Sequence, residues 1–252
     1  MTESARKFKA DSSLELWKRV PFRAKAAVLV ILYETESGDL NVVLTTRSSN
    51  LRSYPSQAAF PGGRCDHEEE TAWETALREA SEEIGFDPHK FQFEQLCNLP
   101  CYLSRHLLVV IPCLCLIKSR DGSPITLEEI SPSINEQEVD VVFSFPLKAV
   151  LAHDGSYFVS YTEGDWLNHV YGFYQLDIPN NDSSYWVAAD NNKVSGESIS
   201  SAPVVGLTAH MLVDCARIAY PLVKFINEGA EYGFEAAIYD MLRDGKFNST
   251  RM

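Results

Sequence analysis

Short apolar runs bounded by glycine, proline, aspartate or serine recur along this 252-residue chain. Runs of this length, rich in valine, isoleucine and leucine, are typical of buried β-strands. They predict strands at Ala26–Tyr33, Leu40–Thr46, Leu107–Ile117 and Val139–Phe145. We expect a further strand pair at Tyr157–Thr162 and Val170–Leu176, with its turn near Gly164 and Asp165.

Apolar residues spaced three and four positions apart predict helices elsewhere. From Thr71 to Ile84 the chain is rich in helix formers, and its apolar stripe consists of Trp73, Ala76, Leu77, Ala80 and Ile84. Similar patterns predict a short helix from Pro146 through Ala152, a longer helix from Leu207 to Ile226 and a last helix at Glu235–Leu242. Pro221 is expected to kink or break the longer helix, because proline has no backbone N–H.

Three carboxylates, Glu79, Glu82 and Glu83, lie within little more than one turn of the helix that begins at Thr71. At about 100° per residue, Glu79 and Glu83 are about 40° apart beside the apolar stripe, and Glu82 lies farther around. Like charges at this spacing repel one another and need a positive partner. Carboxylate oxygens suit Mg2+ or Mn2+, which keep positions for water and substrate phosphates. The alternative is a solvated acidic face on an ordinary amphipathic helix.

The residues from Gly63 to Phe86 resemble the Nudix box, G-x5-E-x7-R-E-U-x-E-E-x-G-U, in which U is a bulky apolar residue. Six residues rather than five separate Gly63 from Glu70, and Ala80 is smaller than usual, but the other fixed positions match. The resemblance implies a hydrolase of diphosphate compounds. It also implies an α/β fold, an α/β/α sandwich with a mixed sheet, to which this chain adds C-terminal helices.

The same resemblance implies roles for the box residues. Glu79, Glu82 and Glu83 would be the ligands of Mg2+ or Mn2+, and an ion pair between Glu70 and Arg78 would tie the preceding loop to the helix. The remaining structural positions of the box are the glycines Gly63 and Gly85. Gly63, together with Gly62, would form a tight turn where a side chain does not fit.

The segment before the box resembles the signature of the coenzyme A diphosphatase branch, L-L-T-x-R-[SA]-x3-R-x3-G-x3-F-P-G-G. The matching residues are Leu44, Thr45, Arg47, Ser48, Arg52 and Phe60–Gly63. Val43 and Ser56 depart from the signature, and Ser56, which replaces a glycine, bears on the loop shape and the substrate. Downstream, Leu99–Arg105 is similar to fungal peroxisomal members of the branch. The resemblance covers residues 26–150 and extends weakly to residues 206–208.

A diphosphate is polyanionic, so in such a hydrolase metal ions would neutralise its oxygens and lower the pKa of a bound water. Positioning and electrostatic stabilisation would be the main contributions of the protein. A carboxylate is expected to take the proton of the water, and the candidates are Glu82, Glu136 and Glu138. From coenzyme A the products would be 4'-phosphopantetheine and adenosine 3',5'-bisphosphate.

The net charge of −13 repels polyanions overall and gives no support for nucleic-acid binding. Attraction of a phosphate substrate must therefore be local. Arg47, Arg52 and Arg64 are the expected substrate-binding residues, because the arginine fork suits phosphate oxygens, although solvated arginines are the alternative. Since no apolar run reaches the roughly 18 residues of a membrane span, we expect no membrane association.

We expect a single domain over residues 1–252, with a core at about 24–180 and a helical extension at about 203–245. The six cysteines show neither a CxxC pair nor the spacing of zinc ligands, so they indicate no second site. Because Glu3, Asp11 and Glu15 interrupt the basic N-terminal residues and do not fit a transit or signal segment, we expect an intracellular protein with reduced thiols. The last residues, Thr250–Met252, resemble a peroxisomal address of the Ser-Lys-Leu kind. Threonine and methionine replace the serine and leucine of that address, so the location is expected to be either peroxisomal or cytoplasmic.

Three functions fit these patterns. The first is a metal-dependent diphosphatase of free, oxidised or acylated coenzyme A. The second keeps the chemistry but acts on oxidised nucleoside triphosphates such as 8-oxo-dGTP, an alternative that Ser56 leaves open. The third is a Nudix-fold binding module without turnover, which the intact carboxylates disfavour. The sequence leaves the number of metal ions and the oligomeric state open.

Overall fold

The computed structural model describes residues 2–8, 10–151, 158–166, 169–179, 186–188, 201–223 and 232–248. Its centre is a mixed sheet in which six strands follow the order β11-β8-β2-β1-β7-β5. Their bounds are β1 Lys25–Glu34, β2 Leu40–Arg47, β5 Gln92–Asn98, β7 Val109–Lys118, β8 Val139–Pro146 and β11 Trp186–Ala188. β1 and β7 run parallel, whereas the other neighbours in this order are antiparallel.

Three short strands extend this sheet: β3 (Ala58–Ala59) pairs with β2, β4 (Gly62–Arg64) with β1, and β6 (Tyr102–Leu103) with β7. A second sheet has the order β12-β10-β9 and consists of β9 Phe158–Trp166, β10 His169–Pro179 and β12 Ser201–Val205. β12 contacts β3, so the second sheet meets the first at the segment that leads into β4.

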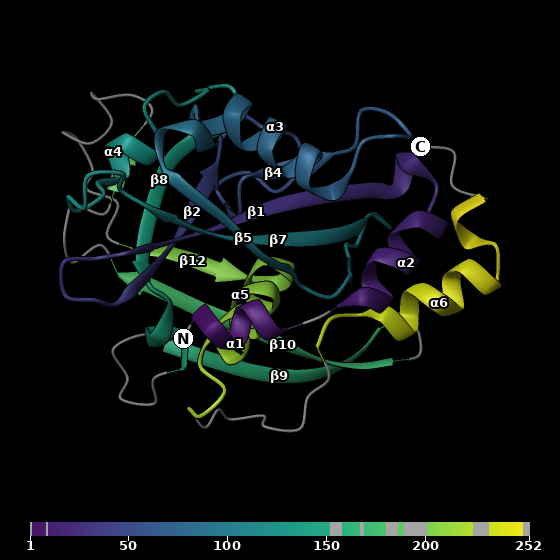
Figure 1. Cartoon of the computed structure of the whole chain (residues 1–252). Coiled ribbons are helices and arrows are strands. Elements are labelled where there is room, and N and C mark those ends of the chain that lie inside the picture. Colours follow the sequence, from purple (N-terminus) through teal and green to yellow (C-terminus); the bar gives the residue numbers. More distant parts are fainter. Residues whose placement is uncertain are drawn as a thin grey trace.

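The core lies on both faces of the central sheet. β1 and β7 are buried along nearly their whole length, as their continuous apolar sequences require. Helix α3 (Ala72–Ile84) covers one face, while α5 (Gly206–Ala219) and the second sheet lie on the other side (Figure 1). The remaining helices are α1 Thr2–Lys7, α2 Asp11–Arg19, α4 Leu127–Ile130 and α6 Glu235–Arg243, with 3-10 turns at Phe22–Ala24, Pro88–Lys90, Leu147–Leu151 and Lys246–Asn248.

Both ends of α3 are fixed by local chemistry. At its start the Thr71 hydroxyl accepts a hydrogen bond from the Glu74 N–H, and the Glu74 carboxylate accepts one from the Thr71 N–H. At its end Gly85 adopts a left-handed conformation with φ 68°. Ala76, Ala80 and Ile84 of the predicted stripe are fully buried, whereas Trp73 and Leu77 are half-buried against the core.

The structure confirms the α/β fold class with a mixed sheet. The strands expected at Ala26–Tyr33, Leu40–Thr46, Leu107–Ile117 and Val139–Phe145 are present as β1, β2, β7 and β8. The helix expected from Thr71 is α3, and the last expected helix is α6. The longer helix is α5, which ends at Ala219, just before Pro221.

Two local predictions are wrong. The turn expected near Gly164 and Asp165 is not there, because β9 continues to Trp166, which pairs with His169. Pro146 ends β8 instead of beginning a helix, and the turn that follows is a 3-10 helix at Leu147–Leu151. Ala152 and Ile226 lie outside the described residues.

The amphipathic helices α1 and α2 and the edge strand β5 were not predicted from the apolar pattern. β5, with the sequence QFEQLCN, pairs with β7 at the edge of the sheet that the structure describes. Helix α2 packs against α6, and α1 packs against α5 and β5. Residues 180–184, 191–200 and the last four residues, which include the expected peroxisomal address, lie outside the described part of the chain. The division into a core and a C-terminal extension stays a prediction.

None of the helices among the described residues is long and apolar enough to cross a membrane.

Candidate active site

The turn at Gly62 and Gly63, here called the glycine turn, lies against α3. A Cβ on Gly63 would lie 2.5 Å from the carboxylate of Glu79. A Cβ on Gly62 would overlap the backbone of β1, and Gly62 has φ 154°, which side chains rarely tolerate. The Gly62 N–H donates a 3.0 Å hydrogen bond to the Glu83 carboxylate. The two glycines therefore bring the backbone of β4 into contact with both carboxylates.

Arg78 is the centre of an ion-pair network on α3. Its Nε donates to Glu70 at 2.9 Å, and its Nη1 donates to Glu79 at 3.0 Å and to Glu82 at 3.1 Å. Its Nη2 donates to the Arg64 carbonyl at 2.9 Å. The ion pair of Glu70 with Arg78 is thus present, and the six-residue gap after Gly63 does not displace it.

Glu70 is nearly fully buried beneath the loop that joins β4 to α3. Its carboxylate also accepts a 2.7 Å hydrogen bond from the Asp66 N–H. Burial raises the pKa of the Glu70 carboxyl, but the hydrogen bonds from Arg78 and Asp66 outweigh burial and hold this pKa below its usual value. Glu70 is therefore an ionised anchor for the loop.

Arg78 changes the expectation for the carboxylate cluster, by which we mean Glu79, Glu82 and Glu83. It supplies a positive partner to Glu79 and Glu82, so two of the three carboxylates already have a cation within the protein. Across the described residues, no group of three or more histidine, cysteine, aspartate or glutamate side chains is arranged as a ready-made metal site. The charge argument for a metal ion therefore concentrates on Glu83.

Glu83 is 6% exposed, and the Gly62 N–H is its hydrogen-bond donor. Burial, together with the negative charges of Glu79 and Glu138, raises its pKa to about 8, while Gly62 and Arg47 act in the opposite direction. Burial also raises the pKa of Glu79. Buried carboxylates that repel one another are matched by a cation, and their oxygens fit Mg2+ or Mn2+. The donor set thus fits the expected metal.

The three candidates for the catalytic base occupy different positions. Glu138 is exposed, yet its charge acts on both Glu79 and Glu83. Its loop is fixed to α3 by a 2.9 Å hydrogen bond from the Asn135 N–H to the Glu83 carbonyl. Glu82 is exposed and bound to Arg78, and Glu136 is exposed on the loop. The charge of Glu82 acts on Glu79 as well, but Glu138 is the one of the three whose charge acts on both Glu79 and Glu83.

The three expected substrate-binding arginines have different surroundings. Arg47 is half-buried and lines a pocket of about 810 Å3, and its positive charge lowers the pKa of the Glu83 carboxyl. Arg52 is exposed in the loop between β2 and β3. Arg64 is exposed at the end of β4, where its carbonyl binds Arg78. The geometry therefore gives Arg47 the strongest connection to the carboxylates.

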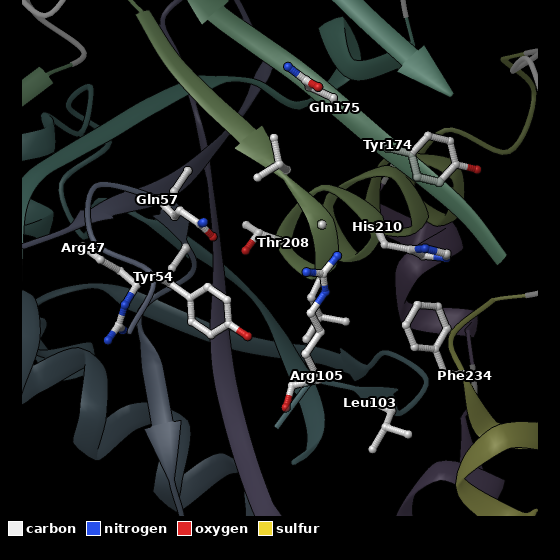
Figure 2. A pocket seen from close by; sticks show the side chains of 16 residues that line it. Arg47, Tyr54, Gln57, Leu103, Arg105, Tyr174, Gln175, Thr208, His210 and Phe234 are labelled. Carbon is white, nitrogen blue, oxygen red and sulfur yellow. The ribbon is translucent and has the colours of Figure 1, made fainter. Parts of the chain in front are cut away.

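Segments from distant parts of the sequence build this pocket. Figure 2 shows Arg47, Tyr54 and Gln57 on one side of the pocket and Tyr174, His210 and Phe234 on the other, with Arg105 and Thr208 between them. Of this set only Arg47 was predicted from the sequence. Arg105 and Thr208 belong to segments that resemble the coenzyme A diphosphatase branch, which is the signal that pointed to them. His210 and Phe234 gave no such signal.

A buried network supports the wall that carries His210 and Phe234. The Asp214 carboxylate accepts hydrogen bonds from the Tyr102 hydroxyl at 2.8 Å and from the Arg217 guanidinium at 3.0 Å. The Gly233 N–H, next to Phe234, donates to the same carboxylate at 3.2 Å. The rings of His210 and Phe234 lie 4.7 Å apart, edge to face. This wall is therefore built from satisfied polar groups and packed rings.

Two loops beside the pocket hold residues in left-handed backbone conformations. Ser56 has φ 57° and Tyr54 has φ 54° in the loop after β2, and Leu107 has φ 60° in the loop between β6 and β7. The loops touch through the rings of Tyr54 and His106, which are 5.3 Å apart. Ser56 thus adopts the left-handed conformation that glycine, the residue of the branch signature at this position, adopts readily. The replacement of glycine by serine therefore leaves the left-handed turn in place.

The cysteines form no disulfide. Cys65, in the loop before α3, is buried, and its Sγ lies 3.2 Å from the Thr75 hydroxyl. Burial raises the pKa of the Cys65 thiol and raises that of Cys97 to about 12. Cys113 and Cys115 are fully buried in β7. None of these thiols is activated as a nucleophile.

Comparison with known proteins identifies one family. The model of the NUDIX domain matches residues 23–160. Nudix hydrolase 15, mitochondrial, of Arabidopsis thaliana is 31% identical over 78% of this chain and 59% of its own length. The peroxisomal coenzyme A diphosphatase 1 of Saccharomyces cerevisiae is 31% identical over 86% of this chain and 75% of its own. The peroxisomal coenzyme A diphosphatase of Caenorhabditis elegans is 29% identical over 59% of each chain.

The chain thus spans 59% of the length of the plant and nematode relatives and 75% of the yeast relative. Among solved structures, an Ap4A hydrolase of Caenorhabditis elegans is 21% identical over 49% of this chain and 80% of its own, with a TM-score of 0.35.

Proposed function

The chain belongs to the Nudix hydrolase family, and on that premise we propose that it is a metal-dependent diphosphatase of coenzyme A or of its oxidised or acylated derivatives. One observation carries this proposal. Arg47, a residue of the coenzyme A diphosphatase signature, pairs across the sheet with Val139, the neighbour of Glu138, and also lines the pocket, and its charge lowers the pKa of the buried Glu83 carboxyl. The same side chain therefore links the hydrolytic carboxylates to the space that would hold the rest of the substrate.

Glu83 and Glu79, with Glu82 beside them, would hold Mg2+ or Mn2+. When bound, the metal supplies positive charge for the diphosphate oxygens and lowers the pKa of a water. The chain itself keeps the ligands in place: Gly62 fixes Glu83, and Arg78 fixes Glu79 and Glu82. Arg47 would bind a phosphate oxygen, because its fork is suited to that geometry.

Glu138 is the group that we assign as the base. Its position at the solvent edge, within the field of Glu79 and Glu83, suits a carboxylate that receives a proton from water. The water oxygen bonds to phosphorus, and the bond between that phosphorus and the bridging oxygen breaks. With coenzyme A this releases 4'-phosphopantetheine and adenosine 3',5'-bisphosphate, and the bridging oxygen leaves with one of them.

The relatives support this substrate class, because two of the three cited above are named coenzyme A diphosphatases. The alternative substrate, an oxidised nucleoside triphosphate, rested on the replacement of a signature glycine by Ser56. Since Ser56 keeps the left-handed turn, the loop geometry gives that alternative no specific support.

The deciding experiment measures the hydrolysis of coenzyme A and of 8-oxo-dGTP with Mg2+, with Mn2+ and with a chelator. We expect metal-dependent cleavage of coenzyme A, at least about 100-fold slower in Glu83→Gln and in Glu138→Gln. Glu128→Gln removes an exposed carboxylate on α4 and Glu136→Gln one on the loop of Glu138, so both controls should stay near the wild-type rate.

Faster cleavage of 8-oxo-dGTP than of coenzyme A would keep the chemistry but overturn the substrate. Turnover of neither compound would contradict the proposed function and favour a binding module. Equal losses in Glu136→Gln and Glu138→Gln would remove the assignment of the base.

A further inference from the structure

The pocket has the opposite charge from the chain as a whole. Although the net charge is −13, the described residues that line the pocket include Arg47 and Arg105 and no aspartate or glutamate. A cavity with low-dielectric walls and one sign of charge attracts ligands of the opposite sign. The lining therefore favours an anionic ligand, and its volume of about 810 Å3 is large enough for a nucleotide.

The two arginines of the pocket have different surroundings. Arg47 pairs across the sheet with Val139, the neighbour of Glu138, and so belongs to the end of the pocket where the diphosphate would be cleaved. Arg105 extends from the loop between β6 and β7 into the middle of the pocket (Figure 2). Within the described part of the chain, Arg105 has no ion-pair partner. Its charge is thus available to a second anionic group of a ligand.

Coenzyme A carries one such second group. Besides the diphosphate, it has a phosphate on the 3' position of the ribose, whereas its pantetheine arm is uncharged. An unpaired arginine in the pocket suits the nucleotide arm better than the pantetheine arm, because arginine binds phosphate through paired, charge-assisted hydrogen bonds. The rings of Tyr174, His210 and Phe234 offer apolar surface for the base of the same arm.

We propose that the pocket binds the nucleotide arm of the substrate and that Arg105 determines specificity by binding the ribose 3'-phosphate. This inference rests on the proposed function for its substrate, but its geometry concerns a different residue and a different phosphate. The first residues of α5, which include Thr208, line the same pocket.

The test compares binding of adenosine 3',5'-bisphosphate with that of adenosine 5'-monophosphate by calorimetry, which does not depend on turnover. We expect the wild-type protein to bind the bisphosphate about tenfold more tightly than the monophosphate. This preference should disappear in Arg105→Gln and be partly restored in Arg105→Lys. Arg120→Gln is the matched control, because Arg120 follows the end of the ten-residue β7 whereas Arg105 precedes its start, about 30 Å away along the strand.

A preference that is absent in the wild type, or that Arg105→Gln retains, would overturn the inference. The second arm measures kcat/KM for coenzyme A and for dephospho-coenzyme A. The ratio of the two values should fall about tenfold in Arg105→Gln and stay unchanged in Arg120→Gln. If the wild type cleaves neither compound, the proposed function fails, and calorimetry still decides the role of Arg105.

Discussion

The glycine turn and the two pocket loops both use unusual backbone angles, but they use different residues for them. Gly62, with φ 154°, has backbone atoms where a side chain would begin. The loops beside the pocket instead place Tyr54, Ser56 and Leu107 at φ between 54° and 60°. Glycine is thus obligatory where space is missing, whereas other residues are accepted where only the torsion is unfavourable.

The two regions also differ in how their residues are distributed along the chain. The carboxylate cluster, its arginine and its glycine turn lie within residues 62–83 and are held together by one helix and the strand before it. The pocket draws on the loop after β2, the loop after β6, strand β10, the start of α5 and Phe234. One region is defined by local sequence and the other by tertiary packing.

The largest effect in this comparison is expected in the glycine turn, for Gly63→Ala. The added Cβ would lie 2.5 Å from the Glu79 carboxylate, which is the movable end of a side chain, so the carboxylate is displaced while the fold survives. Because a displacement of about 1 Å in an active site can cost about 100-fold in rate, we expect a loss of that order in metal-dependent hydrolysis. The measurements are kcat and the metal concentration for half-maximal activity.

The control for this prediction is Gly122→Ala. Gly122 also has a positive φ, of 82°, but no atom lies within 4 Å of its added Cβ. Its substitution should lower stability by about 1 kcal/mol through backbone strain and leave hydrolysis nearly unchanged. Equal activities of the two variants would mean that close approach of β4 to Glu79 is not what Gly63 provides.

A smaller effect is expected from Glu70→Gln. This variant tests whether the charge of Glu70, paired with Arg78, stabilises the loop before α3. The pKa of Glu70 is lowered in the folded protein, so its ionised form stabilises the fold above the unfolded pKa of about 4.3, and this contribution is lost as the pH falls through the folded value. The variant should therefore unfold about 1–2 kcal/mol more easily at pH 7. The difference should shrink as the pH falls through the folded pKa of Glu70.

Urea unfolding of both proteins at pH 7, 5 and 3, in the presence of a chelator, measures this difference. A gap that stays constant across the three pH values would show that Glu70 acts through packing or shape and not through its pairing with Arg78.

The same contrast explains what the sequence predicts. Helix α3 was predictable because its caps, its apolar stripe and its acidic positions all lie in one short segment. It begins after Thr71 and ends before Gly85, which matches the predicted range of Thr71 to Ile84. The ion pairs of Arg78 with Glu79 and Glu82 were not predicted. The direction of the Arg78 side chain depends on its hydrogen bond to Glu70, which a sequence pattern does not give.

The pocket was predictable only at Arg47 and, through resemblance, at the segments of Arg105 and Thr208. His210 reaches the pocket because α5 packs on β10, and Phe234 because the Gly233 N–H is held by Asp214. These are contacts between distant segments, for which no local periodicity exists. The carboxylate cluster could therefore be predicted from local sequence, whereas the pocket residues are brought together by tertiary packing.

The smallest effect concerns the strain in the pocket loops and is expected for Ser56→Gly. Ser56 pays a torsional cost at φ 57° that glycine avoids, but glycine also gains freedom in the unfolded chain, so the net stabilisation should be below about 1 kcal/mol. Because the turn closes through hydrogen bonds from the Ser56 N–H to the Arg47 carbonyl and from the Arg47 N–H to the Gln57 carbonyl, its shape should persist. Urea unfolding gives the stability, and kcat/KM for coenzyme A gives the function. A lower stability in the variant would contradict the presence of strain at Ser56, whereas a changed substrate preference at equal stability would mean that the serine hydroxyl itself contacts the substrate.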